Sequence, residues 1–210
     1  LIKALEKDKT IDSIVCVTAQ HRNMLDQVLN LFSIQPAYDL DIMVPNQSLV
    51  YITTRALEGL EAVFKDCQPD RVLVHGDTTT SFVAALAAFY HKIPVGHIEA
   101  GLRTGNIYAP WPEEMNRRLT DTISDMHFAP TKSAELNLLQ CGIPKSNITV
   151  TGNTVIDALL YICNRLKNEP GIISQALEHL PLLDGSKKLI LVTGHRRENF
   201  GNGFEQICNA

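Results

Sequence analysis

The sequence predicts an α/β protein built on a doubly wound parallel sheet. Short apolar, β-branched runs alternate with longer stretches in which apolar residues recur every three or four positions, as in repeated strand–helix units. Several of the short runs end in glycine and polar residues, which is typical of parallel strands where they turn into the next helix. With 210 residues, of which 45% are hydrophobic, the chain can hold one domain and part of another.

Each predicted strand is a short apolar run bounded by turn residues. The strands are expected at residues 13–18, 71–75, 94–98, 126–129, 148–151 and 188–193. Helices fill the intervals, among them 82–91, 155–167 and one that opens at Glu113. The clearest is 48–66, where residues at three- and four-residue steps form one apolar stripe. This stripe consists of Leu49, Ile52, Ala56, Leu57, Leu60, Val63 and Phe64.

The two ends of the sequence are expected to lie within a longer chain. Residues 1–8 read as the second half of a helix with no strand before it, and residues 202–210 stop inside another helix. A Pro-Gly break at 170–171 indicates a hinge. We therefore expect a first domain over residues 1–150 without its first strand, followed over 151–210 by hinge helices and the truncated beginning of a second domain.

Composition excludes several classes of function. A net charge of −4, from 19 basic against 23 acidic residues, argues against binding to nucleic acid. The longest apolar segment, 82–90, is too short to span a membrane, and the charged N-terminus does not resemble a signal peptide. Five widely spaced cysteines without a CxxC pair predict reduced thiols, with neither a disulfide framework nor a metal site. A cytoplasmic location is expected.

Acidic residues are placed where predicted strands end. In VLVHGDTTTS, residues 72–81, Gly76 permits a tight turn, Thr78 or Thr79 can cap the next helix, and Asp77 faces the edge of the sheet. The next strand delivers Glu99 to the same edge. A long loop rich in Gly, Pro and aromatic residues follows, as is typical of the wall of an active site.

A third acid, Glu113, opens the helix after that loop. Acids gathered at one sheet edge repel each other, which raises the pKa of at least one toward neutrality and suits it to proton transfer. Structural alternatives stay open: Asp77 can be only a turn or cap residue, and Glu113 and Glu114 can pair with Arg117 and Arg118 four residues on.

Histidines lie at several of the same junctions. His75 and His97 are close to the acids in sequence and can orient them, and His21 lies at another strand-to-helix junction. In LILVTGHRRENFG, residues 189–201, His195 and Arg196 suit a diphosphate, since both donate to phosphate oxygens. The alternative is a solvated basic turn.

Six segments together resemble one enzyme family. VTAQHRNMLDQV, VLVHGDTTT, PVGHIEAGLRTG, PWPEEMNRR, ITVTGNTVIDAL and VTGHRRENFG stand in the order and at the intervals found in the bacterial non-hydrolysing UDP-N-acetylglucosamine 2-epimerases. The resemblance implies a GT-B-like protein in which two Rossmann-like domains face a cleft. It also implies an isomerase that interconverts UDP-GlcNAc and UDP-ManNAc, by anti elimination of UDP to a 2-acetamidoglucal and re-addition, and supplies ManNAc-type sugars for cell-surface polysaccharide.

The resemblance also assigns roles to residues. Asp77, Glu99 and Glu113 match the acids that handle the C2 proton and the leaving oxygen, and His195 matches the histidine at the UDP phosphates. Further residues expected at the substrate are His75, Thr78, Arg103 and Arg196. Gln20 and Arg196 match a second, allosteric UDP-GlcNAc site, although Asn23 and Asn46 replace the side chains of activated members.

The family uses no nicotinamide, in keeping with the absence of GxGxxG from this sequence, so no cofactor is expected. A homodimer is implied. Because the family's opening GTRPE turn and most of its second domain are not in the sequence, the 210 residues alone are expected to be inactive. The alternatives are a hydrolysing epimerase that releases ManNAc and UDP, a GT-B glycosyltransferase, and a sugar-nucleotide-binding module without catalysis.

Overall fold

The computed structural model describes residues 1–20, 22–169, 171, 186–190 and 202–209. The chain forms two compact units, Leu1–Gly152 and Asn153–Ala210. The predicted break at 170–171 includes Pro170, which lies outside the described residues. The assignment of residues 151–210 to the beginning of a second domain stays a prediction.

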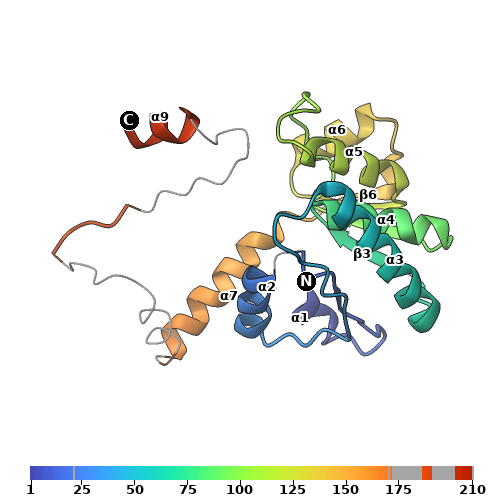
Figure 1. Cartoon of the computed structure of the whole chain (residues 1–210), viewed down its shortest axis with the longest axis horizontal. Coiled ribbons are helices and arrows are strands. Elements are labelled where there is room, and N and C mark those ends of the chain that lie inside the picture. The colour runs from blue at the N-terminus through green and yellow to red at the C-terminus, as the bar shows by residue number, and fades with distance from the viewer. Residues whose placement is uncertain (21, 170, 172–185, 191–201, 210) are drawn as a thin grey trace. The chain divides into compact units, whose positions relative to one another are not determined.

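Strands and helices alternate along the first unit (Figure 1). Its helices are α1 (Ile2–Leu5), α2 (Arg22–Phe32), α3 (Leu49–Cys67), α4 (Thr79–Tyr90), α5 (Glu113–Ile123) and α6 (Lys132–Gln140), with the short 3₁₀ helix η1 (Lys145–Asn147). Its strands are β1 (Cys16–Val17), β2 (Tyr38–Asp39), β3 (Val72–His75), β4 (Val95–Ile98), β5 (Met126–Ala129) and β6 (Ile148–Val150). The second unit contains α7 (Thr154–Asn168) and α9 (Asn202–Asn209).

All strand pairs of the described chain are parallel, which confirms the predicted α/β class. β3, β4, β5 and β6 form a four-stranded sheet in that order, and β1 pairs with β2 in a separate two-stranded sheet. Each step across the larger sheet passes through one α-helix, namely α4, α5 or α6, and the last step also contains η1. The carboxyl ends of its strands therefore lie along one edge, which is where ligands of such sheets bind.

The predicted elements differ from the observed ones mainly at the first sheet. The strand expected at 13–18 is reduced to β1, and β2 was not predicted, because two residues are too few to show an alternating pattern. The predicted strand at 188–193 is only partly described, and residues 188–190 have no regular structure.

Side-chain caps fix where the main helices begin. Ser48 accepts a hydrogen bond from the backbone N–H of Tyr51 at the start of α3. Thr78 does the same for Ser81 at the start of α4, which therefore begins before the predicted residue 82. The cap brings the start of α4 directly next to the end of β3.

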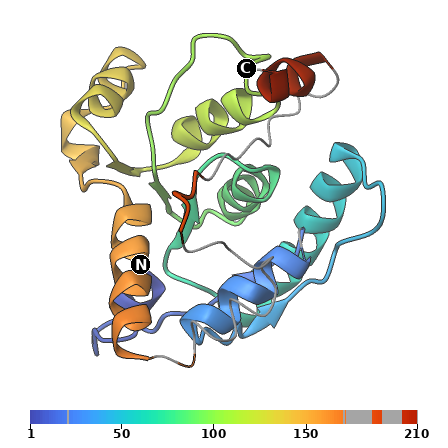
Figure 2. The same cartoon turned by 90° about the vertical axis from the view of Figure 1, so that its left-hand side faces the viewer.

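The core of the first unit lies between α3, α4 and the larger sheet. The predicted stripe of α3 is confirmed, since its buried residues are Ile52, Ala56, Leu60, Val63 and Phe64. α3 packs against α4, as Figure 1 and Figure 2 both show, and α4 packs against β3, β4 and α5. Among the helices that the structure describes, none is long and apolar enough to cross a membrane.

Candidate functional site

The site is built on the neighbouring carboxyl ends of β3 and β4. These strands pair in register up to His75 and Ile98, and the Gly76 N–H donates to the Ile98 carbonyl at 2.9 Å. The chain then turns sharply in both places, with φ of +71° at Gly76 and +70° at Glu99. Glycine adopts this backbone freely, whereas a glutamate there is unusual and is a mark of functional sites.

The Glu99 carboxylate lies over the turn that precedes Asp77. Its Oε2 atom is 3.3 Å from the position that a Cβ on Gly76 would occupy, and 3.8 Å from Nε2 of His75. The two strand ends therefore bring Glu99 and the backbone of Gly76 together, with Asp77 next along the chain. A side chain at position 76 would compete with the Glu99 carboxylate for space.

Helix α5 contacts the Asp77 turn through two side chains. The amide of Asn116 donates to the Asp77 carbonyl at 2.9 Å, and Arg117 forms an ion pair with the Asp77 carboxylate. Glu113 lies three and four residues before them and hence on the same face of the helix. The half-buried Glu113 is thereby directed to the side of α5 that faces Asp77.

Glu114, in contrast to Glu113, is enclosed by the protein and bound to its neighbours. Its side chain is fully buried and accepts hydrogen bonds from the Thr104 N–H at 3.1 Å and from Arg118 at 3.0 Å. The predicted Glu114–Arg118 pair is confirmed. Arg117 lies 3.4 Å from Glu114 and pairs with Asp77, so the alternative that it serves Glu113 is wrong.

The hydroxyl groups after Asp77 are engaged within the protein. Thr78 accepts from the backbone N–H of Ser81, and the Ser81 hydroxyl donates to the His75 carbonyl at 2.6 Å. Thr80 donates to the side chain of Gln20 at 2.8 Å. These contacts explain the polar run by capping and by attachment of the segment after β1 to α4. A substrate-binding role of Thr78 and an allosteric role of Gln20 stay predictions.

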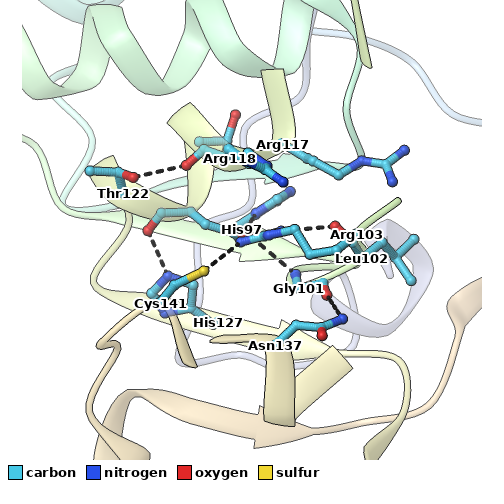
Figure 3. A network of polar contacts seen from close by, with 12 residues as sticks. His97, Gly101, Leu102, Arg103, Arg117, Arg118, Thr122, His127, Asn137 and Cys141 are labelled. Carbon is cyan, nitrogen blue, oxygen red and sulfur yellow. Dashed lines mark hydrogen bonds and ion pairs between the residues drawn. The ribbon is translucent and has the colours of Figure 1, made fainter. Parts of the chain in front are cut away.

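Arg103 lines a hollow next to α5 rather than the Asp77 turn. Its guanidinium group binds the Asp121 carboxylate at 2.7 Å and the carbonyl of Leu102 at 2.8 Å. The hollow, of about 530 Å³, lies between α5 and α6, and Figure 3 shows Arg103 with Asn137 and Cys141 at this place. Its predicted contact with substrate stays a prediction.

Two buried residues, His97 and Asp121, form a pair, and only His97 is among the residues singled out from the sequence. His97 is placed by β4, and its imidazole bridges the Asp121 carboxylate of α5 and the carbonyl of Gly76. His97 can thus orient Asp77 as predicted, through its hydrogen bond to the carbonyl of the preceding residue, Gly76. Asp121 could have been suspected because it lies four residues after Arg117, on the same helical face.

The pKa of His75 is lowered near the acids. Burial lowers its pKa, and the charge on His97 adds to this effect, while the carboxylate of Glu99 acts in the opposite direction. The net result is a pKa below the ordinary value of 6.5. At neutral pH, His75 can therefore donate or accept a hydrogen bond beside Glu99 without carrying charge.

The remaining predicted residues, His195 and Arg196, lie outside the described residues, as does His21. Within the described ranges, no three His, Cys, Asp or Glu side chains are grouped so that they could hold a metal ion.

Comparisons with known proteins agree with the geometry. A family model described as UDP-N-acetylglucosamine 2-epimerase matches residues 3–210. A UDP-N-acetylglucosamine 2-epimerase of Yersinia pestis is 59% identical over 210 residues, and one of Escherichia coli strain K12 is 56% identical. These matches cover 100% of this chain but 56% of each relative, so the chain spans about half their length.

Solved structures share the fold. A crystal structure of UDP-GlcNAc 2-epimerase from Neisseria meningitidis bound to UDP-GlcNAc has a TM-score of 0.91 at 58% identity, covering 98% of this chain and 55% of that one. The Methanocaldococcus jannaschii enzyme in complex with UDP-GlcNAc and UDP has a TM-score of 0.71 at 41% identity, covering 76% and 44%.

Proposed function

The chain belongs to the UDP-N-acetylglucosamine 2-epimerase family, and on this premise we propose that the whole protein interconverts UDP-GlcNAc and UDP-ManNAc. One carboxylate removes the proton from C2 of the sugar, and the C1–O bond breaks so that its electron pair leaves with UDP. The 2-acetamidoglucal then accepts a proton at C2 on the opposite face while a UDP oxygen bonds to C1.

The observation that carries this proposal is the meeting of Asp77 and Glu99 at neighbouring strand ends. The reaction needs groups that take and give protons, and positioned carboxylates perform both steps. The closeness of the Glu99 carboxylate to Gly76, the residue before Asp77, supports a shared position for the two acids. The face of α5 that binds Asp77 brings Glu113 to the same region.

The carboxylates differ in their surroundings, which suits them to different steps. Asp77 is paired with Arg117, which fixes the position of its carboxylate for a role as the base. Glu99 lies beside the neutral imidazole of His75. Glu113 forms no ion pair among the described residues and is free to assist the leaving oxygen.

Departure of UDP requires groups that offset negative charge. We assign this role to His195 and Arg196 from residues 151–210, which we take to be hinge helices and the beginning of a second Rossmann-like domain. We also expect the whole protein to be a cytoplasmic homodimer. Sedimentation of the whole protein at micromolar concentration tests the dimer, and a single monomeric species would contradict it.

Incubation of the whole protein with UDP-GlcNAc in D₂O tests the reaction. We expect UDP-ManNAc to form and deuterium to enter C2 without an acceptor, as followed by ¹H NMR. Asp77→Asn should lower the rate of deuterium entry by at least about 100-fold, within the range for loss of an acid–base group. Asp70→Asn, at the exposed other end of β3, should leave it unchanged.

The same experiment separates the alternatives. A hydrolysing epimerase would accumulate UDP and free ManNAc in equal amounts. A glycosyltransferase would leave C2 unlabelled and turn over only with an acceptor. A binding module would show neither product, and Asp77→Asn would leave ligand binding unchanged.

A further inference from the structure

Both ring nitrogens of His97 face atoms that accept hydrogen bonds. The side chain is fully buried in β4, with Nε2 2.8 Å from the Gly76 carbonyl oxygen and Nδ1 2.6 Å from Oδ1 of Asp121. A backbone carbonyl oxygen can only accept, so Nε2 must carry a proton. The charge of His97 then depends on which of Nδ1 and Asp121 holds the other proton.

Asp121 is in its ionised form. Burial opposes ionisation, but the hydrogen bond with His97 and the charge of Arg103 outweigh it and hold the pKa of Asp121 below its ordinary value. The second carboxylate oxygen, Oδ2, lies 2.7 Å from Arg103 and 3.3 Å from the Gly101 N–H, both of which are donors. An ionised carboxylate only accepts, so Nδ1 of His97 also carries a proton.

We propose that His97 is a buried imidazolium which, together with Asp121, positions the two turns that carry Asp77 and Glu99. This inference rests on the proposed function. The imidazolium holds the carbonyl of Gly76, the residue directly before Asp77. The carboxylate holds the N–H of Gly101, two residues after Glu99.

The pair acts on the turns through their backbones and does not touch the substrate. Asp121 binds one turn through His97 and the other directly, so a single carboxylate couples the two strand ends. Charge makes these hydrogen bonds about twice as strong as neutral ones. Placement matters, since a misplacement of about 1 Å in an active site can lower the rate about 100-fold.

Other groups around His97 fit a cation at this place. Asp121 supplies the neighbouring negative charge, and the lowered pKa of His75 keeps a second positive charge away from this place. His127, the partner of His97 in β5, directs its Nε2 atom to the Asp121 backbone carbonyl at 2.8 Å and not to the carboxylate. The Asp121 carboxylate thus remains available to His97 and Arg103.

The protonation of His97 can be measured on the unmodified whole protein, without reference to activity. In ¹⁵N-histidine-labelled protein we expect both ring nitrogens of His97 to show protonated chemical shifts from pH 6 to pH 8. The His97→Gln variant assigns the signal. An unprotonated ring nitrogen at pH 7 would overturn the proposal, whatever reaction the protein catalyses.

Positioning is tested by Asp121→Asn, which keeps the size of the side chain but removes its charge. We expect kcat to fall about 10- to 100-fold while KM for UDP-GlcNAc changes by less than about threefold. Hydrogen exchange should accelerate at the amides of 76–78 and 99–101. The matched control is Asp125→Asn, which removes an exposed ion pair with Arg71 beyond the end of α5.

The outcomes distinguish this inference from the proposed function. Wild-type kcat and unchanged exchange in Asp121→Asn would overturn the positioning role while leaving the epimerase intact. A rise in KM at constant kcat would overturn it too, since it indicates a loss of binding only. An inactive wild-type protein would refute the proposed function, and exchange and NMR would still decide whether the pair holds the turns. If Asp121→Asn does not fold, the NMR measurement decides alone.

Discussion

Arg117 of α5 and Asp77 of the β3 turn form an ion pair across a sequence separation of 40 residues. Nη1 of the same guanidinium group lies 3.4 Å from Glu114, which is fully buried. Arg117 therefore connects Asp77, an acid of the proposed reaction, to Glu114, which binds the Thr104 N–H in the loop between β4 and α5. The ion pair explains how a helix from one strand–helix unit fixes a turn of the preceding unit.

The dual contact of Arg117 predicts a combined effect on stability and turnover. Arg117→Ala should lower the free energy of unfolding by about 3–5 kcal/mol, because it leaves the Asp77 carboxylate without its cation and the fully buried Glu114 with Arg118 alone. It should also lower kcat, since Asp77 loses its orientation. Arg118→Ala, which removes a partner of Glu114 alone, should retain kcat. Urea unfolding and initial rates measure both effects, and equal kcat losses would contradict the assignment.

The neighbouring acids Glu113 and Glu114 should respond in opposite ways. Glu113→Gln should lower kcat and change stability by less than about 0.5 kcal/mol, because the residue lies outside the buried ion-pair network. Glu114→Gln should lower the free energy of unfolding by about 3–5 kcal/mol, since Arg117 and Arg118 lose a buried carboxylate. The idea fails if Glu113→Gln is the less stable variant or retains full activity.

The pKa of His75 should report on the charges around it. Its NMR titration should have a midpoint below 6.5, because burial and the charge on His97 favour the neutral ring. The carboxylate of Glu99 raises this pKa, so Glu99→Gln should move the midpoint further down. Glu58→Gln, an exposed acid on α3, serves as the control. An upward shift in Glu99→Gln would show that the two side chains do not interact as described.

Two loop glycines should differ in their tolerance of alanine. Both have positive φ, +85° at Gly101 and +81° at Gly105, so each substitution carries a backbone cost of about 1–2 kcal/mol. A Cβ on Gly101 would also lie 2.3 Å from the carbonyl oxygen of Ala134, whereas one on Gly105 would meet open space. Gly101→Ala should therefore be the more destabilised variant by at least about 2 kcal/mol, measured by urea unfolding. Equal losses would argue against the close approach.

Local patterns were sufficient for the larger sheet and for its helices. The stripe on α3 and the apolar runs of β3 to β6 are signals within one element, and each is confirmed. The position of Asp77 and Glu99 at one edge followed from the rule that parallel strands end together. β2 was not predicted because its two residues are too few to show an alternating hydrophobic pattern.

Partnerships between elements could not be predicted in the same way. Pairing of Arg117 with Glu113 was one alternative from the sequence, because a four-residue spacing is visible there and a partner 40 residues away is not. The same holds for His97 and Asp121, which are 24 residues apart and meet only once β4 and α5 are packed. The helix cap predicted at Thr78 or Thr79 is confirmed at Thr78, whereas the bond of Thr80 to Gln20, 60 residues away in the sequence, carries no local signal.

The division of α5 into two faces has a consequence for how this protein can evolve. Its inward positions 114, 117 and 121 each make polar contacts with other segments, while Met115 and Leu119 are 38% exposed. In random mutagenesis scored by growth or survival, we therefore expect positions that do not tolerate substitution to recur every three or four residues along α5. Drift would accumulate at 115 and 119, and the charged positions would change only together with their distant partners.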